Sequence, residues 1–200
     1  TGDVINFIHI LGSVLDLGVP SDSTVSLAKL TATGTKDATT FLRGDNTFAS
    51  AGGDNTPYFY VRKTSDQTSI NHNTLTKVTF DTEDLDTDTA FASDKFTVPS
   101  GEGGKYFIFA SATLAGYGTS KLRRGQLYLY KNGSTLKETY SDFQANDAHI
   151  TQEYVSGIFD LSASDYIEVY ARIRSSDSGN GNYVQQGGKA TAFGGYKIIG

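Results

Sequence analysis

The sequence contains no cysteine, methionine or tryptophan, and only 3 of its 200 residues are proline. Without cysteine, the chain cannot form disulfides, use a thiol nucleophile or hold a metal through thiolates. No apolar run has the length of a membrane-spanning segment, so we expect no membrane insertion. The formal net charge of -5 argues against nucleic acid as a partner, because neutralising phosphates requires clustered Lys and Arg.

The sequence is rich in aromatic side chains, with 12 Tyr and 12 Phe, and it has 22 Gly. Short apolar segments alternate with clusters of Gly, Asn, Asp and Ser, at the spacing of a β-sandwich or barrel, and no segment of normal length has helical periodicity. The fold class is therefore all-β. The predicted strands are 58–62, 77–80, 105–114, 126–130, 135–140, 154–159, 166–174, 183–186 and 190–199. The strongest hairpin signal is Asn132-Gly133, since this pair accepts the positive φ of a type I′ turn.

The composition changes near residues 51–55, a polar segment with two glycines. We place a domain boundary there, with an N-terminal stalk or attachment segment at 1–53 and a β domain at 54–200. The first segment is too short to hold a core by itself, because chains below about 40 residues normally need staples or partners. Identical copies wound around one axis would supply them, so an extended β or irregular stalk is the best interpretation.

Two strands indicate assembly. Residues 166–174 alternate cleanly between apolar and polar side chains, as expected for a sheet with one wet side. Residues 105–114 do not, because Tyr106 and Ile108 point one way while Phe107 and Phe109 point the other. A sandwich core covers only one of those faces, and the other needs a partner. The segment 58–61 repeats this behaviour, so the sequence favours an oligomer.

Several segments carry a family resemblance. They are Phe80, Asp86, Phe91 and Phe96 with the run 104–109, then 126–133, 165–169 and 193–199. In order and spacing they resemble the globular head of complement component 1, q subcomponent, which is related to tumour necrosis factor. The resemblance implies an antiparallel jelly-roll sandwich that forms a homotrimer. It assigns the following residues to the trimer interface or core: Tyr58, Tyr60, Tyr106, Phe107, Phe109, Phe193 and Tyr196.

Residues 35–50 carry a second resemblance. Thr-Phe-Leu-Arg-Gly-Asp-Asn-Thr-Phe at 40–48 is similar to the Thr-Phe-Leu-Arg-Gly-Asp-Gly-Thr-Trp element of many bacteriophage tail-fibre proteins, with Asn46 for Gly and Phe48 for Trp. That element usually precedes a C-terminal head domain. Its position ahead of the jelly roll therefore implies a viral fibre.

Short motifs that suggest other chemistry have simpler explanations. Arg43-Gly44-Asp45 matches an integrin ligand over only three residues, and a tight turn explains it. The acidic run Asp81–Asp88 has oxygen ligands that suit calcium but lacks a calcium-loop pattern, so we interpret it as a solvated loop. His9, His72 and His149 have no metal-site spacing. We therefore expect no cofactor, no metal and no enzymatic activity.

The remaining chemistry is that of a binding surface. The loops 115–125, 141–152 and 175–188 are long and polar and have aromatic residues in or beside them. Flat aromatic faces stack on sugar rings, while the aromatics could instead close the ends of the sandwich. The only basic cluster, 121–124, is expected to be a solvated loop. The candidate receptor-binding residues are Tyr117, Arg123, Arg124, Tyr140, Phe143 and Tyr183.

Together these patterns predict a trimeric bacteriophage fibre protein on the virion, outside cells. Its head would bind a host-surface glycan or protein, and its N-terminal segment would join other tail or baseplate proteins. A structural or decoration fibre that binds no receptor is the first alternative, and a polysaccharide depolymerase is the second.

Overall fold

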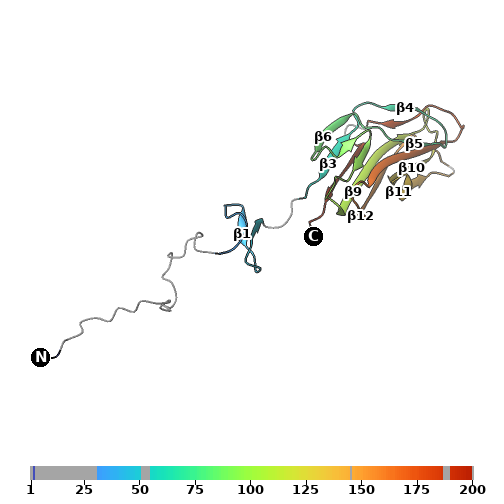
Figure 1. Cartoon of the computed structure of the whole chain (residues 1–200). Helices are drawn as coiled ribbons and strands as arrows, with labels where there is room; N and C mark the ends of the chain where they lie inside the picture. The colour runs from blue at the N-terminus through green and yellow to red at the C-terminus, as the bar shows by residue number, and fades with distance from the viewer. Residues whose placement is uncertain (1, 3–30, 51–54, 145, 187–189, 200) are drawn as a thin grey trace. The chain divides into compact units, whose positions relative to one another are not determined.

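The computed structural model describes residue 2 and residues 31–50, 55–144, 146–186 and 190–199. The chain divides into two compact units, residues 1–52 and 53–200 (Figure 1). These described ranges contain strands and no helix, and hence no helix that could cross a membrane. Residues 3–30 of the predicted stalk, which include His9, lie outside them.

The first unit contains an antiparallel hairpin of β1 (Thr40–Leu42) and β2 (Phe48–Ser50). A turn joins the strands, in which the Asn46 amide donates to the Arg43 carbonyl at 3.0 Å. The Asp45 carboxylate accepts from the Thr47 hydroxyl at 2.6 Å and from the Thr47 amide at 3.1 Å. The tight turn predicted for residues 43–45 is therefore confirmed.

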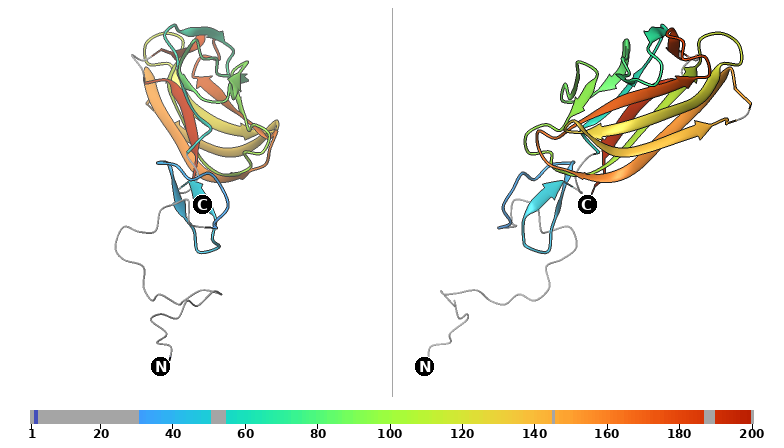
Figure 2. Two further views of the ribbon diagram at one scale, coloured as in Figure 1. Left: turned by 60° about the vertical axis from the view of Figure 1, so that its left-hand side comes forward. Right: turned by 90° about the vertical axis from the view of Figure 1, so that its right-hand side faces the viewer.

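The second unit, which we call the sandwich domain, is a two-layered β-sandwich (Figure 2). Its strands are β3 (Tyr58–Arg62), β4 (Gln67–Ile70), β5 (Leu75–Lys77), β6 (Thr82–Asp86), β7 (Phe91–Ala92), β8 (Lys95–Thr97), β9 (Gly104–Ala115), β10 (Leu122–Lys131), β11 (Ser134–Asp142), β12 (Ile150–Leu161), β13 (Tyr166–Ser175), β14 (Asn182–Gln185) and β15 (Ala192–Lys197).

The two layers are antiparallel sheets. One, the β10 sheet, has the order β11-β10-β13-β8-β7, with β5 also paired to β13. The other, the β9 sheet, has the order β4-β14-β9-β15-β3-β6, with β12 on the second edge of β9. β9 and β12 pair along their whole length, from Gly104 opposite Leu161 to Ala115 opposite Ile150. The predicted all-β antiparallel architecture is confirmed.

The core lies between the sheets and follows the alternation of the sequence. Ile167, Val169, Ala171 and Ile173 of β13 are fully buried, as predicted. From β9, Tyr106 and Ile108 enter the core, whereas Phe107 and Phe109 lie on the opposite face and are half-buried. Burial first, and then the Glu102 carboxylate, raise the pKa of Tyr106 to about 12.

Aromatic rings from several strands meet within this core. Phe59 stacks on Phe96 at a centroid distance of 4.4 Å and meets the edge of Phe193 at 4.8 Å. Phe193 is also 6.1 Å from Phe91, in an edge-on arrangement. The last strand is therefore fastened to the core by an aromatic cluster whose members come from distant parts of the sequence.

The acidic run Asp81–Asp88 differs from the prediction. It is not a loop, because Thr82–Asp86 forms the edge strand β6, paired with β3. Its carboxylates stabilise the local backbone: Asp81 accepts from the amides of Thr64 and Ser65, and Asp86 accepts from the amides of Ala90 and Phe91. Burial alone would raise the pKa of Asp81, but hydrogen bonds from the Ser65 and Thr64 hydroxyls, and then from their amides, hold it below its usual range.

Other local predictions have mixed outcomes. The Asn132-Gly133 hairpin between β10 and β11 is confirmed, with φ of 52° and 79° at its two residues. Of the strand predicted at 77–80, only Lys77 lies in a strand, at the end of β5. In the basic cluster, Arg123 and Arg124 belong to strand β10 rather than to a solvated loop.

Candidate functional site

One face of the β9 sheet packs on the core. The other face is apolar, and the described residues leave it uncovered. Its most exposed large side chains, at 38–63% exposure, are Tyr58, Leu85, Tyr154, Ile158 and Tyr196. Together with the half-buried residues Tyr60, Phe107 and Phe109, they form what we call the β9-sheet face.

Strand register places these side chains side by side. Phe107 of β9 lies opposite Ile158 on one neighbouring strand and opposite Tyr196 on the other. Tyr196 in turn lies opposite Tyr58, so one row of apolar side chains crosses four strands. Directly opposite residues have their Cβ atoms on the same side of a sheet, about 4.5–5.5 Å apart. The row is therefore continuous.

Gly194 makes room in the next row. It pairs with Phe109 and with Tyr60, and a Cβ at this position would lie 2.7 Å from the Phe109 ring. The absent side chain lets the Phe109 ring lie against the sheet, 6.3 Å from Tyr60 and 6.4 Å from Tyr154. The aromatic rings thus form a connected layer rather than isolated exposed groups.

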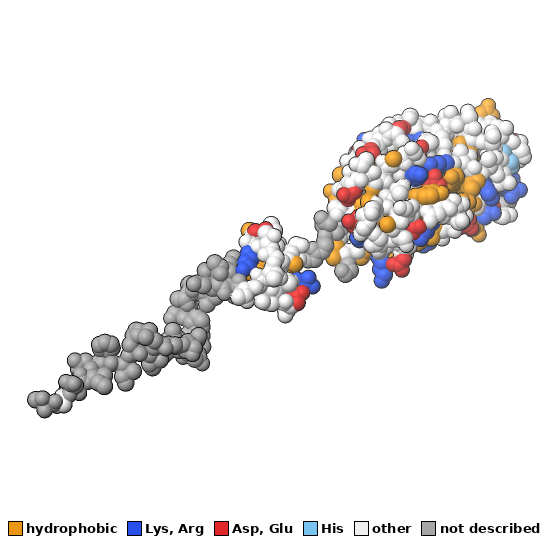
Figure 3. Space-filling view, viewed as in Figure 1, with side chains coloured by type: hydrophobic (Ala, Val, Ile, Leu, Met, Phe, Trp, Pro, Cys, Tyr) orange, Lys and Arg blue, Asp and Glu red, His pale blue; other side chains and the backbone are white. Residues whose placement is uncertain are grey.

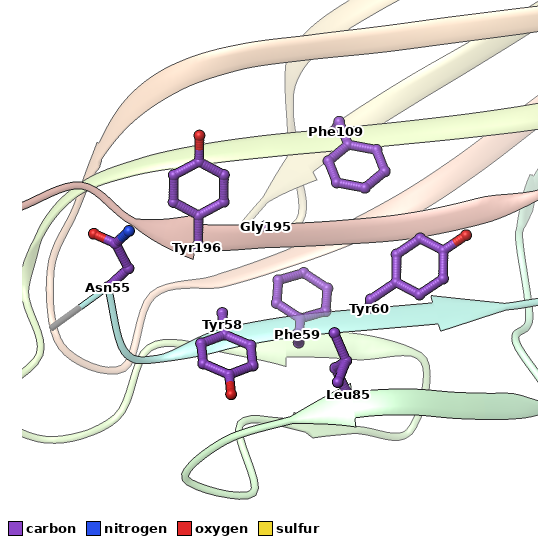
Figure 4. Close-up of a pocket in the computed structure, with 8 residues that line it drawn as sticks. All are labelled: Asn55, Tyr58, Phe59, Tyr60, Leu85, Phe109, Gly195 and Tyr196. Carbon is purple, nitrogen blue, oxygen red and sulfur yellow. The ribbon is translucent and has the colours of Figure 1, made fainter.

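A shallow depression of about 450 Å³ lies within this face (Figure 4). Tyr58 and Tyr60 of β3, Tyr196 of β15 and Leu85 of β6 surround it, and Phe109 closes one side. It contains no cluster of polar or titratable groups that could perform chemistry. Its apolar lining suits apolar side chains from a partner.

A second candidate surface is one end of the sandwich, where the three predicted loops meet. The Gly116 amide donates to the His149 carbonyl at 3.3 Å, and the Ser176 amide donates to the Lys121 carbonyl at 2.9 Å. Arg123 Nε donates to Asp147 Oδ1 at 2.6 Å. Arg123 and then Ser176 lower the pKa of the Asp147 carboxyl.

Tyr117 is the most prominent aromatic residue of this end. Its side chain is 58% exposed, although its ring lies against Gly181, where a Cβ would come within 2.7 Å of it. Gly181 has a φ of +117°, so both the backbone and the ring favour glycine at this position. The Tyr117 amide donates to Asn182 Oδ1 at 3.0 Å, which joins the first loop to β14.

The six predicted receptor-binding residues do not lie on one surface. Tyr117 and Arg123 lie at the loop end. Phe143 is partly buried and packs against the core, so it is less accessible than expected. Tyr183 is half-buried in β14, opposite Ala115.

Arg124 and Tyr140 lie together elsewhere, on the outer face of the β10 sheet. The Arg124 guanidinium carbon is 4.1 Å from the centroid of the Tyr140 ring. Tyr140 is 53% exposed, and Arg124 is also 3.9 Å from Asp142. This pair therefore belongs to a different surface from Tyr117 and Arg123.

Sequence reasoning missed part of the β9-sheet face. Tyr154 and Ile158 were inside a predicted strand, and their period-two spacing around Ser156 could have placed them beside Phe107 and Phe109. Leu85 lies inside the acidic run 81–88, which we interpreted from the sequence as a solvated loop. The described residues contain no group of three or more His, Asp or Glu side chains suited to hold a metal ion.

Scans with protein-family models and with curated protein sequences find no match. Among solved structures, the chain is similar to murine APRIL, with 14% identity over 70% of this chain and 98% of that one, and a TM-score of 0.51. It is also similar to the globular domain of zebrafish complement 1qA protein, with 16% identity, coverage of 72% and 98%, and a TM-score of 0.50. The sandwich domain therefore has the jelly-roll fold of these domains.

Proposed function

We propose that the protein is a homotrimeric bacteriophage fibre protein. In this account the sandwich domain is its C-terminal head, and the head binds a host-surface glycan or protein. The observation that carries the proposal is the β9-sheet face. Soluble monomers rarely leave a contiguous layer of large apolar and aromatic side chains uncovered.

Copies of the same chain are the partner that best fits this face. An isologous or cyclic assembly offers an apolar surface of matching size and chemistry, as homo-oligomers commonly do. The resemblance to the head of complement component 1, q subcomponent, implies that the number of copies is three. Burial of the β9-sheet face would leave the opposite β10 sheet and the loop end accessible.

The hairpin of β1 and β2 supports a viral fibre as the context. It contains the segment that resembles the tail-fibre element, and the Asp45 carboxylate organises its turn through Thr47. The ion pair between Arg43 and Asp45 is loose, at 3.9 Å, and both side chains are more than half exposed. Nothing in this turn requires a receptor, so we place host binding in the sandwich domain.

The purified full chain tests this function on isolated host envelope glycans. Retention without cleavage supports a receptor-binding fibre. An absence of retention favours a structural or decoration fibre, and shortened glycans would indicate a depolymerase.

A matched variant links binding to assembly. Ile158→Glu places a charge in the β9-sheet face, where the wild-type side chain is 63% exposed in a single chain. We expect a folded monomer that binds more weakly than the trimer, because three linked sites gain avidity. Undiminished retention by a monomeric variant would contradict a contribution from trivalent binding.

A further inference from the structure

The outer face of the β10 sheet concentrates positive charge at one end. Arg124 lies directly opposite Arg174 on the neighbouring strand, and Arg172 follows on the same face. Like charges placed opposite each other across strands destabilise a sheet. On one side of the sandwich domain, Figure 3 shows Lys and Arg side chains next to exposed hydrophobic ones.

These charges are only weakly compensated. The sandwich domain has five arginines, and Arg62 and Arg123 each form an ion pair at 2.6 Å. Arg124 has only a distant carboxylate, Asp142 at 3.9 Å. Within the described part of the chain, no carboxylate pairs with Arg172 or Arg174.

Polar donors at this position are also unused. The Nε atoms of Arg124 and Arg172 are buried and have no hydrogen-bond partner. Gln126, at 7% exposure, lies between them, and no hydrogen bond joins its side chain to the described residues. Unpaired buried donors are costly and uncommon in folded proteins, so these two guanidinium groups have hydrogen-bonding capacity that the described residues leave unused.

Aromatic surface completes the arrangement. Gln126 lies opposite Tyr140 on one side and opposite Arg172 on the other, which sets all three side chains on one face. Tyr140 is more than half exposed, and its ring covers the Arg124 guanidinium. A guanidinium held against a ring keeps its in-plane N–H groups available for an anion.

We propose that Arg124, Gln126, Tyr140, Arg172 and Arg174 form a binding site for an acidic sugar, a saccharide ring that carries a carboxylate or a phosphate. The arginine side chains bind the anionic group, and the Gln126 amide binds one of its oxygens or a ring hydroxyl. The Tyr140 face contacts the sugar ring. The inference names the ligand class of the head, and to that extent it rests on the proposed function.

The geometry fits a repeated ligand. The β10 sheet and the β9-sheet face are on opposite sides of the sandwich, so a trimer that buries the latter leaves three such sites open. Each site alone need bind only weakly, because an acidic polysaccharide can occupy several of them at once.

The test measures dissociation constants of the purified full chain for three probes: an oligogalacturonate, a phosphorylated mannan and an unmodified mannan. We expect binding to one or both acidic probes, weakening with salt, and little binding to the neutral one. The carboxylate and phosphate arms show which anionic group the site prefers.

Substitutions then locate the site. Arg172→Gln and Arg174→Gln should each weaken binding by about tenfold or more, because each removes a charge-assisted hydrogen bond. Lys95→Gln is the matched control. Lys95 lies on the same face, opposite Glu168, and this substitution also removes one positive charge. It should change the affinity by less than about twofold, as expected for screened charge alone.

NMR spectra of individual arginine side chains distinguish binding at this site from non-specific electrostatic attraction. On binding, the Nε–Hε resonances of Arg124 and Arg172 should shift as their guanidinium groups gain an anionic partner. The proposal is overturned if neither acidic probe binds, if the neutral mannan binds equally well, or if Lys95→Gln costs as much as Arg172→Gln. Retention on host glycans without acidic-sugar binding would remove this site but leave the proposed function standing. Binding of acidic sugars without retention on host glycans would support this site and contradict the proposed function.

Discussion

The last strand, β15, allows core packing and assembly to be separated by two substitutions three residues apart. Phe193 enters the core and is fully buried, whereas Tyr196 lies on the β9-sheet face and is 41% exposed. We expect Phe193→Ala to lower the free energy of unfolding by about 3–5 kcal/mol, from lost burial and the cavity left behind. Part of this loss is the edge-on contact with Phe59 at 4.8 Å.

Tyr196→Ala should mainly weaken the association of the subunits. Complete burial of a large apolar side chain stabilises by about 1.5–3 kcal/mol, and the exposed two-fifths of Tyr196 would account for about 0.6–1.2 kcal/mol per subunit. Three subunits give about 2–4 kcal/mol per trimer, a roughly 30- to 1,000-fold weaker association constant. Within one chain, the same change should cost no more than about 1 kcal/mol.

Urea unfolding, followed by circular dichroism at several protein concentrations, distinguishes the two variants. Phe193→Ala should lower the midpoint at every concentration. Tyr196→Ala should leave the midpoint of dilute, dissociated protein almost unchanged and move the rise of the midpoint to higher protein concentrations, because stability and association are linked. The reasoning fails if Phe193→Ala costs less than about 1 kcal/mol, or if the wild-type midpoint is independent of concentration.

Three further outcomes are expected. The pKa of Asp165 is lowered to about 2 by hydrogen bonds from Lys131, the Ser162 amide and Asn132. The contribution of Asp165 to stability should therefore be present above about pH 4 and lost as the pH falls toward 2. Asp165→Asn should flatten that part of a pH series of unfolding curves. Deletion of residues 193–200 should abolish soluble trimer, and a folded trimer on size exclusion would show that the strand is peripheral. Asp45→Ala should leave adsorption to host cells unchanged; lost adsorption, with variants in the sandwich domain unaffected, would move the binding site to the hairpin.

Local pattern predicted the parts of the fold that one strand determines by itself. The alternation of 166–174 identified the buried face of β13, and the two-sided apolarity of 105–114 separated Tyr106 from Phe107. The Asn132-Gly133 turn also followed from backbone conformational preference. In each case the relevant neighbours are close in sequence, so the pattern contains the information.

Features set by tertiary pairing were not predictable in this way. Asp and Glu are poor strand formers, yet 82–86 forms β6 because the edge of β3 offers hydrogen bonds, a case of context overriding propensity. Phe143 resembled an exposed loop aromatic, but its loop folds over the core. The Arg172 side chain gained its place beside Gln126 only through the pairing of β10 and β13.

The central claim is that the β9-sheet face is covered by other copies of the chain. The most direct test is light scattering coupled to size exclusion of the purified chain at micromolar concentration. The account predicts a molar mass three times that of the 21.5 kDa chain. It also predicts that Ile158→Glu lowers this mass to that of one chain. A monodisperse wild-type monomer would contradict the account.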